Sequence, residues 1–222
     1  MQYGLRSTFL VLALSACYRP PVDPTTQGSY RYEVEAPAEG SRSVTVQATF
    51  IGARTDRIGI ARESTAFVHD MELVARDGLH PVSREGNEWH EGTCRTACTV
   101  RYRVDLGALA AACGDEVDCA RRVGFDATLS PALAWLVHPV PKRDVPVTVH
   151  VETPNAVQFA SGMQPSDETG HNFAFRSYDL DEGSFTAFGP MRRYRIIVDH
   201  REIDVAIIDR TKYTMNNKTI KN

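Results

Sequence analysis

The pentapeptide His90-Glu91-Gly92-Thr93-Cys94 is the chain's nearest approach to a catalytic motif. A zincin site needs two histidines one helical turn apart, so that both imidazoles reach one metal while the intervening glutamate acts as the base. Here the second position is a cysteine, and the surrounding residues have the pattern of a strand and a turn. The motif therefore predicts a polar hairpin face with no metal ligand.

The remaining candidate groups for catalysis are scattered along the chain. Neighbours in a strand point to opposite faces, which argues against a dyad in the adjacent pairs His69-Asp70 and Asp199-His200. The acidic residues between 179 and 182 lack EF-hand spacing and predict a solvated turn. No nucleophile elbow and no phosphate-binding glycine loop occurs. We predict no catalytic residue, no metal ligand and no cofactor, and a small hydrolase with a loop His/Asp site is the alternative.

The first residues have the parts of an export signal. Arg6 is followed by a short apolar run, Phe9 to Leu14, which is shorter than the roughly 20 residues that span a bilayer. Leu14-Ser15-Ala16-Cys17 resembles a bacterial lipobox, which implies cleavage before Cys17 and acylation of that residue. Several acyl chains together anchor a protein stably. We therefore expect a signal peptide over 1–16 and membrane attachment through Cys17.

The remaining four cysteines are Cys94, Cys98, Cys113 and Cys119. In an oxidising compartment an even count predicts two disulfides, for which the sequence permits three pairings. Cys94 and Cys98 flank a short loop, and Cys113 and Cys119 bracket another, so geometry favours the local pairs. A zinc site made from the four cysteines lacks the paired Cys-x2-Cys spacing and is disfavoured.

Composition limits the domain organisation and the partners. The formal net charge is −3, and no basic patch is dense enough to follow a phosphate backbone, so we expect no nucleic-acid partner. Residues 17–29 are Pro-rich and predict a tether. Residues 30–210 are long enough for one domain with a core. Residues 211–222 change from Arg to Lys usage and predict a disordered or out-of-frame tail.

Period-2 alternation recurs along the whole domain. It predicts strands over Tyr30–Ala36, Val44–Phe50, Val145–Val151, Tyr194–Val198 and Val205–Ile208, and over several other short runs, separated by Gly, Pro and Asp turns. One helical stretch is expected between Leu106 and Arg122, interrupted at Gly114. Trp89 and the strand from Thr99 to Leu106 are expected to form a disulfide-closed hairpin. The pattern predicts an all-β fold, an antiparallel β-sandwich with one short, disulfide-braced helical segment.

The order of these landmarks resembles the N-terminal β-sandwich domain of glycyl-aminopeptidase-type zinc metallopeptidases. The matching features are an opening strand, an Asp-Gly turn, a Trp strand, a Val-x-Tyr-x-Val strand and a Gly-x-Phe strand; they lie at 32–50, 77–78, Trp89, 100–104 and 183–185. The Trp-x-Pro-Gly segment that the family often shows is missing between Ile58 and Val68. The family's His-Glu-x-x-His helix lies in a downstream domain, so no catalytic residue carries over.

The resemblance implies a non-catalytic domain that serves protein contact or substrate docking beside a peptidase domain or another envelope protein. With the lipobox, it implies an outer-membrane location, periplasmic or surface-facing, because Tyr18 rather than Asp follows Cys17. The alternative within the same location is an unrelated structural or ligand-binding lipoprotein.

Overall fold

A computed structural model describes residues 28–36, 42–53, 55–90, 96–114, 116, 119–123, 126–154, 157–182, 184–198 and 201–208. The predicted signal peptide, most of the tether and the tail fall outside the described residues. Among those described, no helix is both long and apolar enough to cross a membrane.

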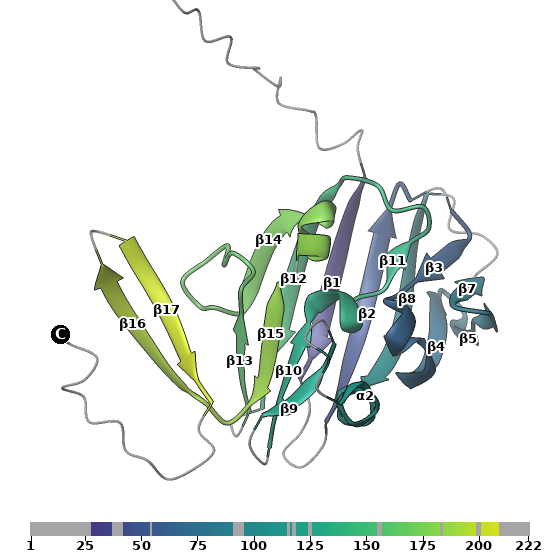
Figure 1. Ribbon diagram of the computed structural model, residues 1–222. Coiled ribbons are helices and arrows are strands. Elements are labelled where there is room, and N and C mark those ends of the chain that lie inside the picture. Colours follow the sequence, from purple (N-terminus) through teal and green to yellow (C-terminus); the bar gives the residue numbers. More distant parts are fainter. Residues whose placement is uncertain are drawn as a thin grey trace, which may run out of the picture.

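A seven-stranded sheet forms one layer of the molecule (Figure 1). Its spatial order is β14 (Asn172–Arg176), β12 (Pro146–Glu152), β1 (Ser29–Glu35), β2 (Ser43–Ile51), β8 (Ala97–Asp105), β4 (Val68–Ala75) and β5 (Gly78–Pro81). Every neighbouring pair is antiparallel except β1 and β12, which run parallel with Tyr30 opposite Val147. The predicted antiparallel sandwich is confirmed, with this one parallel pair inside it.

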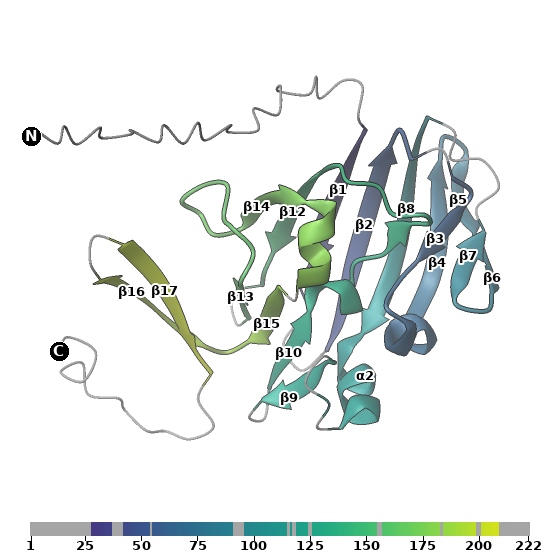
Figure 2. The same cartoon turned by 45° about the horizontal axis from the view of Figure 1, so that its top comes forward.

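Two four-stranded sheets cover one face of the large sheet. One has the order β13 (Gln158–Ser161), β15 (Phe185–Gly189), β10 (Ala127–Pro131) and β9 (Arg121–Val123). The other has the order β11 (His138–Pro139), β3 (Arg57–Gly59), β7 (Glu88–His90) and β6 (Ser83–Glu85). Figures 1 and 2 show the first over the β12–β1 side and the second at the β4 side.

The core lies between these layers and follows the alternation of the sequence. The strands β1, β2, β8 and β12 each bury every second side chain, among them Tyr32, Phe50, Tyr102 and Val149. Burial of one face and solvation of the other is what period-2 patterning predicts for an antiparallel sheet. The strands expected over Tyr30–Ala36, Val44–Phe50 and Val145–Val151 are therefore confirmed to within one or two residues.

The segment after η2 (Ala132–Ala134) crosses the core and is bonded to both layers. From the large sheet, the Tyr32 hydroxyl donates to the Val137 carbonyl at 2.7 Å. From the second layer, the Thr186 hydroxyl accepts the indole N–H of Trp135 at 2.9 Å and donates to the Ser130 carbonyl at 2.8 Å. These bonds satisfy polar groups that would be costly to bury alone.

Helical structure is short. The α-helix α2 spans Leu106–Cys113, and the Asp105 carboxylate accepts the Ala108 amide at its N-terminus. The further 3-10 turns are η1 (Arg62–Phe67) and η3 (Ser177–Glu182). The predicted interruption at Gly114 is confirmed, because the helix ends there with Gly114 at φ 61°, whereas the helix expected to continue to Arg122 is wrong, since Arg121 begins β9. Glycine at that position ends a helix at little steric cost.

The predicted hairpin between Trp89 and Thr99 is wrong. Trp89 lies in β7, which pairs with β3 and β6, whereas Thr99 lies in β8, which pairs with β2 and β4. The two strands belong to different sheets, and the hairpin partner of β7 is the preceding strand, β6, across Gly86 (φ 61°). A positive φ of this kind suits the turn that the β6–β7 hairpin requires.

A separate ribbon of β16 (Arg192–Val198) and β17 (Arg201–Ile207) completes the described fold. Within that part of the chain it shares no strand with the other sheets. Both views show it leaning away from the sandwich beyond β13 and β15 (Figures 1 and 2).

Candidate functional site

His90 ends β7 as a partly exposed side chain. Its Nε2 atom lies 3.5 Å from Oε2 of Glu85, across the β6–β7 hairpin. Residues 91–95, which hold the rest of the pentapeptide, fall outside the described residues. Within the described ranges no three His, Cys, Asp or Glu side chains are arranged to hold a metal ion.

Of the other titratable groups considered in the sequence, Asp70 and Asp179 have local partners, whereas Asp199 and His200 fall outside the described residues. Both His69 and Asp70 are exposed, because the strand bulges there and Asp70 takes φ 54°. The Asp70 carboxylate accepts from the Arg103 guanidinium at 3.2 and 3.3 Å. Asp179 accepts the Arg176 amide at 2.7 Å at the start of η3. These contacts stabilise a bulge and a turn, as expected for surface polar groups.

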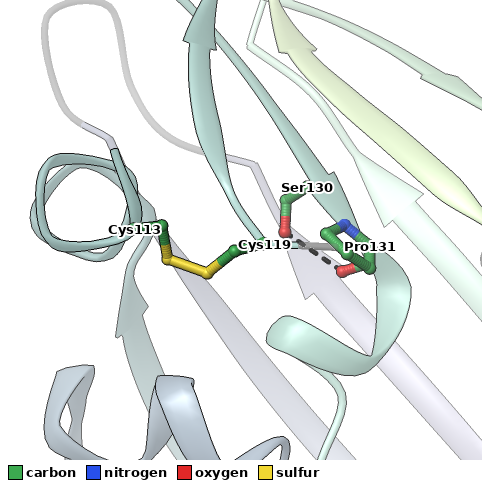
Figure 3. Close-up of a disulfide and its surroundings, with 4 residues drawn as sticks. All are labelled: Cys113, Cys119, Ser130 and Pro131. Carbon is green, nitrogen blue, oxygen red and sulfur yellow. Dashed lines mark hydrogen bonds between the residues drawn. A yellow bond between two sulfur atoms is a disulfide. The ribbon is translucent and has the colours of Figure 1, made fainter. Parts of the chain in front are cut away.

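Three of the five cysteines lie within the residues that the structure describes. Cys113 and Cys119 form a disulfide with a Cα–Cα distance of 5.9 Å. Figure 3 shows this bond joining the end of α2 to the chain that enters β9, close to Ser130 and Pro131. The short, disulfide-braced helix is therefore as predicted. Cys98 in β8 is also disulfide-bonded, but Cys94 and the proposed lipid attachment residue Cys17 fall outside the described residues, so their roles stay predictions.

The face of the ribbon that points away from the sandwich is mostly apolar, with the exposed Arg192 opposite Ile207 at one end. Cross-strand register places Tyr194 opposite Val205 and Ile196 opposite Ile203, with Ile207 continuing the row. Ile203 is 43% exposed and the other four are half-buried. We call these five side chains the ribbon's apolar face. An isolated two-stranded ribbon is marginal in water, and its unpaired edges are templates for further pairing.

The opposite face of the ribbon bounds a cavity of about 210 Å³. Its floor is the outward face of the β13–β15–β10 sheet, and its further wall is the loop that follows β13. Leu129 and Ala187 line the cavity from this outward face, whereas Phe159 and Phe173 border it from the core, where both are buried with ring centroids 5.5 Å apart. From the ribbon come Arg193, Asp204, Ala206 and the following Ile208.

Both charged side chains in the described lining of the cavity come from the ribbon. Arg193 and Asp204 are the charged residues of the described lining, and their closest atoms are 3.6 Å apart. Arg195 lies at the same distance from the other carboxylate oxygen of Asp204. A gap of 3.6 Å is longer than a hydrogen bond, so the contact between Arg193 and Asp204 is electrostatic.

Sequence patterning predicted both strands of the ribbon but not the cavity beneath it. Arg193 and Arg195 alternate with Tyr194 and Ile196, which is the signal of a strand with two different faces. The alternation does not predict which sheet lies next to the face that holds Arg193 and Arg195. The position of Arg193 at this cavity was therefore not predicted.

No protein-family model matches the chain, and no curated protein sequence matches it. Solved structures do match. An aminopeptidase N family protein from Idiomarina loihiensis aligns with 80% of this chain at 14% identity and a TM-score of 0.61, over 32% of its own length. An M1 zinc metallopeptidase from Deinococcus radiodurans aligns with 87% of this chain at 12% identity and a TM-score of 0.46, over 50% of its own length.

The first of these similarities shows a shared fold. The chain spans about a third of the length of that aminopeptidase N family protein, so the likeness is to one part of a larger molecule. This agrees with the expected resemblance at the level of a β-sandwich fold that also occurs in one part of an aminopeptidase N family protein. The narrower resemblance to glycyl-aminopeptidases stays a prediction.

Proposed function

We propose that this chain is a non-catalytic accessory domain that binds a metallopeptidase domain or another envelope protein through the ribbon's apolar face. The observation that carries the proposal is the row from Tyr194 to Ile207, an apolar surface on a two-stranded ribbon whose described edges have no further strand. Apolar surface of this kind is typical of protein contacts. The fold shared with one part of an aminopeptidase N family protein supports a peptidase as the partner.

We further propose that the domain is held at the bacterial outer membrane by an acylated Cys17. The Leu14-Ser15-Ala16-Cys17 sequence supports this attachment. A Pro-rich tether after the anchor would keep the ribbon at a distance from the lipid surface, because proline-rich segments stay extended.

Site-specific photocrosslinking in the native cell tests the contact. A photoreactive residue in place of Ile196 is expected to capture a protein that mass spectrometry identifies as a metallopeptidase or as one recurrent envelope protein. The matched control is Thr148, an exposed residue on the solvated face of the large sheet. Equal capture at Ile196 and Thr148, or none at Ile196, would show that the ribbon is not the contact surface.

Metal analysis and a peptidase assay on the purified full chain test the non-catalytic assignment. We expect neither stoichiometric zinc nor turnover of an aminoacyl amide substrate. Bound zinc together with turnover would replace this proposal by the hydrolase alternative.

A further inference from the structure

Three exposed aliphatic side chains lie together on the solvated face of the large sheet. They are Ile51 at the end of β2, Val74 in β4 and Leu79 in β5, each between 36% and 48% exposed. The other exposed large apolar side chains of the described residues belong to the ribbon and to η3. Val74 and Leu79 are cross-strand partners and therefore share one face.

Small uncharged residues of β8 connect Ile51 to Val74. Ala97 is exposed and lies opposite Ile51 in the strand register, and Thr99 lies opposite Thr49 with the two hydroxyls 2.9 Å apart. The next strand is β4, which pairs directly with β8. We call six uncharged residues the aliphatic patch: Thr49, Ile51, Val74, Leu79, Ala97 and Thr99.

The aliphatic patch lies at the end of the sheet where the tether joins the domain. β1 begins beside the end of β2 (Figure 1), because Ser29 is opposite Ile51, and Gly28 lies directly against the Ile51 carbonyl. The chain from Cys17 to Gly28 can extend by at most 3.6 Å per residue, roughly 40 Å in all. A lipid anchor at Cys17 would therefore keep this end of the domain close to the bilayer.

Carboxylates occupy the same face further along the strands. They include Glu33 and Glu35 of β1, and Glu152 of β12, which is opposite Glu35 in the parallel register. A charged group loses favourable hydration when it enters hydrocarbon. The face is therefore unsuited to lying flat on a bilayer, whereas its uncharged end can meet lipid when the strands tilt toward the surface.

The size and composition of the aliphatic patch fit a lipid surface better than a protein. Specific protein interfaces bury about 800 Å² on each partner and are enriched in Tyr, Trp and Arg. The patch contains none of these residue types, and three aliphatic side chains that are each less than half exposed supply much less area. Fluid hydrocarbon needs no complementary shape, and an anchor raises the local concentration enough to populate a weak contact.

We propose that the aliphatic patch is a lipid contact, in which Ile51, Val74 and Leu79 enter the interfacial region of the bilayer that holds Cys17. This inference rests on the proposed acylation of Cys17. The ribbon lies beyond β13 and β15, on the side of the sandwich away from β4 and β5 (Figures 1 and 2). Contact through the patch therefore leaves the ribbon's apolar face available to a protein partner.

Tryptophan fluorescence in vesicles tests the contact. The native Trp89 and Trp135 are buried, so a surface tryptophan adds a separate signal. The full acylated chain is placed in phosphatidylcholine vesicles with brominated acyl chains, because bromine quenches a nearby indole. We expect Ile51→Trp to lose most of its added emission relative to vesicles without bromine. Gln47→Trp is the matched control and should lose none, since Gln47 is exposed on the same strand and face, about 13 Å away.

Charged substitutions test the side chains themselves. With Val74→Trp as the reporter, Ile51→Asp together with Leu79→Asp should restore the emission, because a carboxylate is costly in hydrocarbon. Gln47→Asp together with Thr148→Asp adds the same charge elsewhere on the face and should leave the quenching unchanged. Circular dichroism checks that each variant is folded.

Vesicle flotation separates this inference from the anchor on which it rests. A chain that does not float with the vesicles would remove the anchor and the contact together. Flotation without quenching of Ile51→Trp, or with equal quenching of Gln47→Trp, would overturn the lipid contact alone. Quenching that requires anionic phosphatidylglycerol would also count against it, because the patch is uncharged. A dimer of the Cys17→Ser chain that the double Asp variant dissociates would assign the patch to a second copy instead.

Discussion

The hydroxyl of Tyr102 donates to the carbonyl of Trp135 at 2.9 Å and accepts from the amide of Val137 at 3.1 Å. One phenol from the large sheet thus satisfies both a carbonyl and an amide of the segment that crosses the core. Buried polar groups of this kind are stabilising when paired and costly when left alone.

Tyr102→Phe is therefore expected to lower the free energy of unfolding by about 2 kcal/mol, because the buried Val137 amide loses its acceptor. Urea denaturation followed by tryptophan fluorescence measures the change. Tyr178→Phe is the control, since Tyr178 is 51% exposed and should change stability by less than about 0.5 kcal/mol. Equal effects of the two substitutions would refute the structural role of the Tyr102 hydroxyl.

The same burial predicts resistance of two tyrosines to alkali. Desolvation raises the pKa of both Tyr32 and Tyr102 well above the ordinary 10.0. In the unfolded chain these phenols ionise near 10, so the stability that they contribute is fully present below that pH and falls as the pH rises beyond it. Ultraviolet titration should show at least two tyrosines that ionise only when the protein unfolds, as judged by circular dichroism. Complete ionisation of all tyrosines in a folded protein would contradict this.

The disulfide at the end of α2 closes a short loop. Replacing both Cys113 and Cys119 by serine is expected to cost about 2 kcal/mol, because a cross-link over so few residues restricts the unfolded chain only modestly. Denaturant unfolding of the double variant beside the oxidised wild type gives the difference. Peptide mapping without reduction checks the pairing, and a bond from Cys113 to any cysteine other than Cys119 would count against it.

The lipid anchor has its own test. Cells that produce the protein and are fed a clickable palmitate analogue should label the wild type, and the protein should sediment with membranes. Cys17→Ser is expected to remove the label and the sedimentation together, because several acyl chains are needed for stable attachment. A labelled Cys17→Ser variant would place the modification elsewhere, and an unlabelled wild type would exclude the anchor.

The alternation of apolar and polar residues predicted the strands of the fold but not the cavity beneath the ribbon. The alternation of Val145 to Val151 and of Val44 to Phe50 was sufficient for two central strands, because each has one buried face. The alternation does not predict which strands pair with one another. Trp89 and Thr99 are near in sequence, yet they lie in different sheets. The cavity depends on β10, β13, β15 and the ribbon meeting in space, which no single stretch encodes.

The parallel pair β1–β12 also has a consequence for how the chain folds. Tyr30 meets Val147 more than a hundred positions later in the chain, so β1 has a neighbour on one side only until most of the domain has been made. Bringing β1 and β12 together closes a long loop, and the chain loses conformational entropy before the stabilising contacts of the pair have formed. Sheets with many such non-local pairs therefore fold slowly. A chain of this design therefore has an unpaired edge on β1 until its second half has been made, and such an edge can pair with other chains during folding.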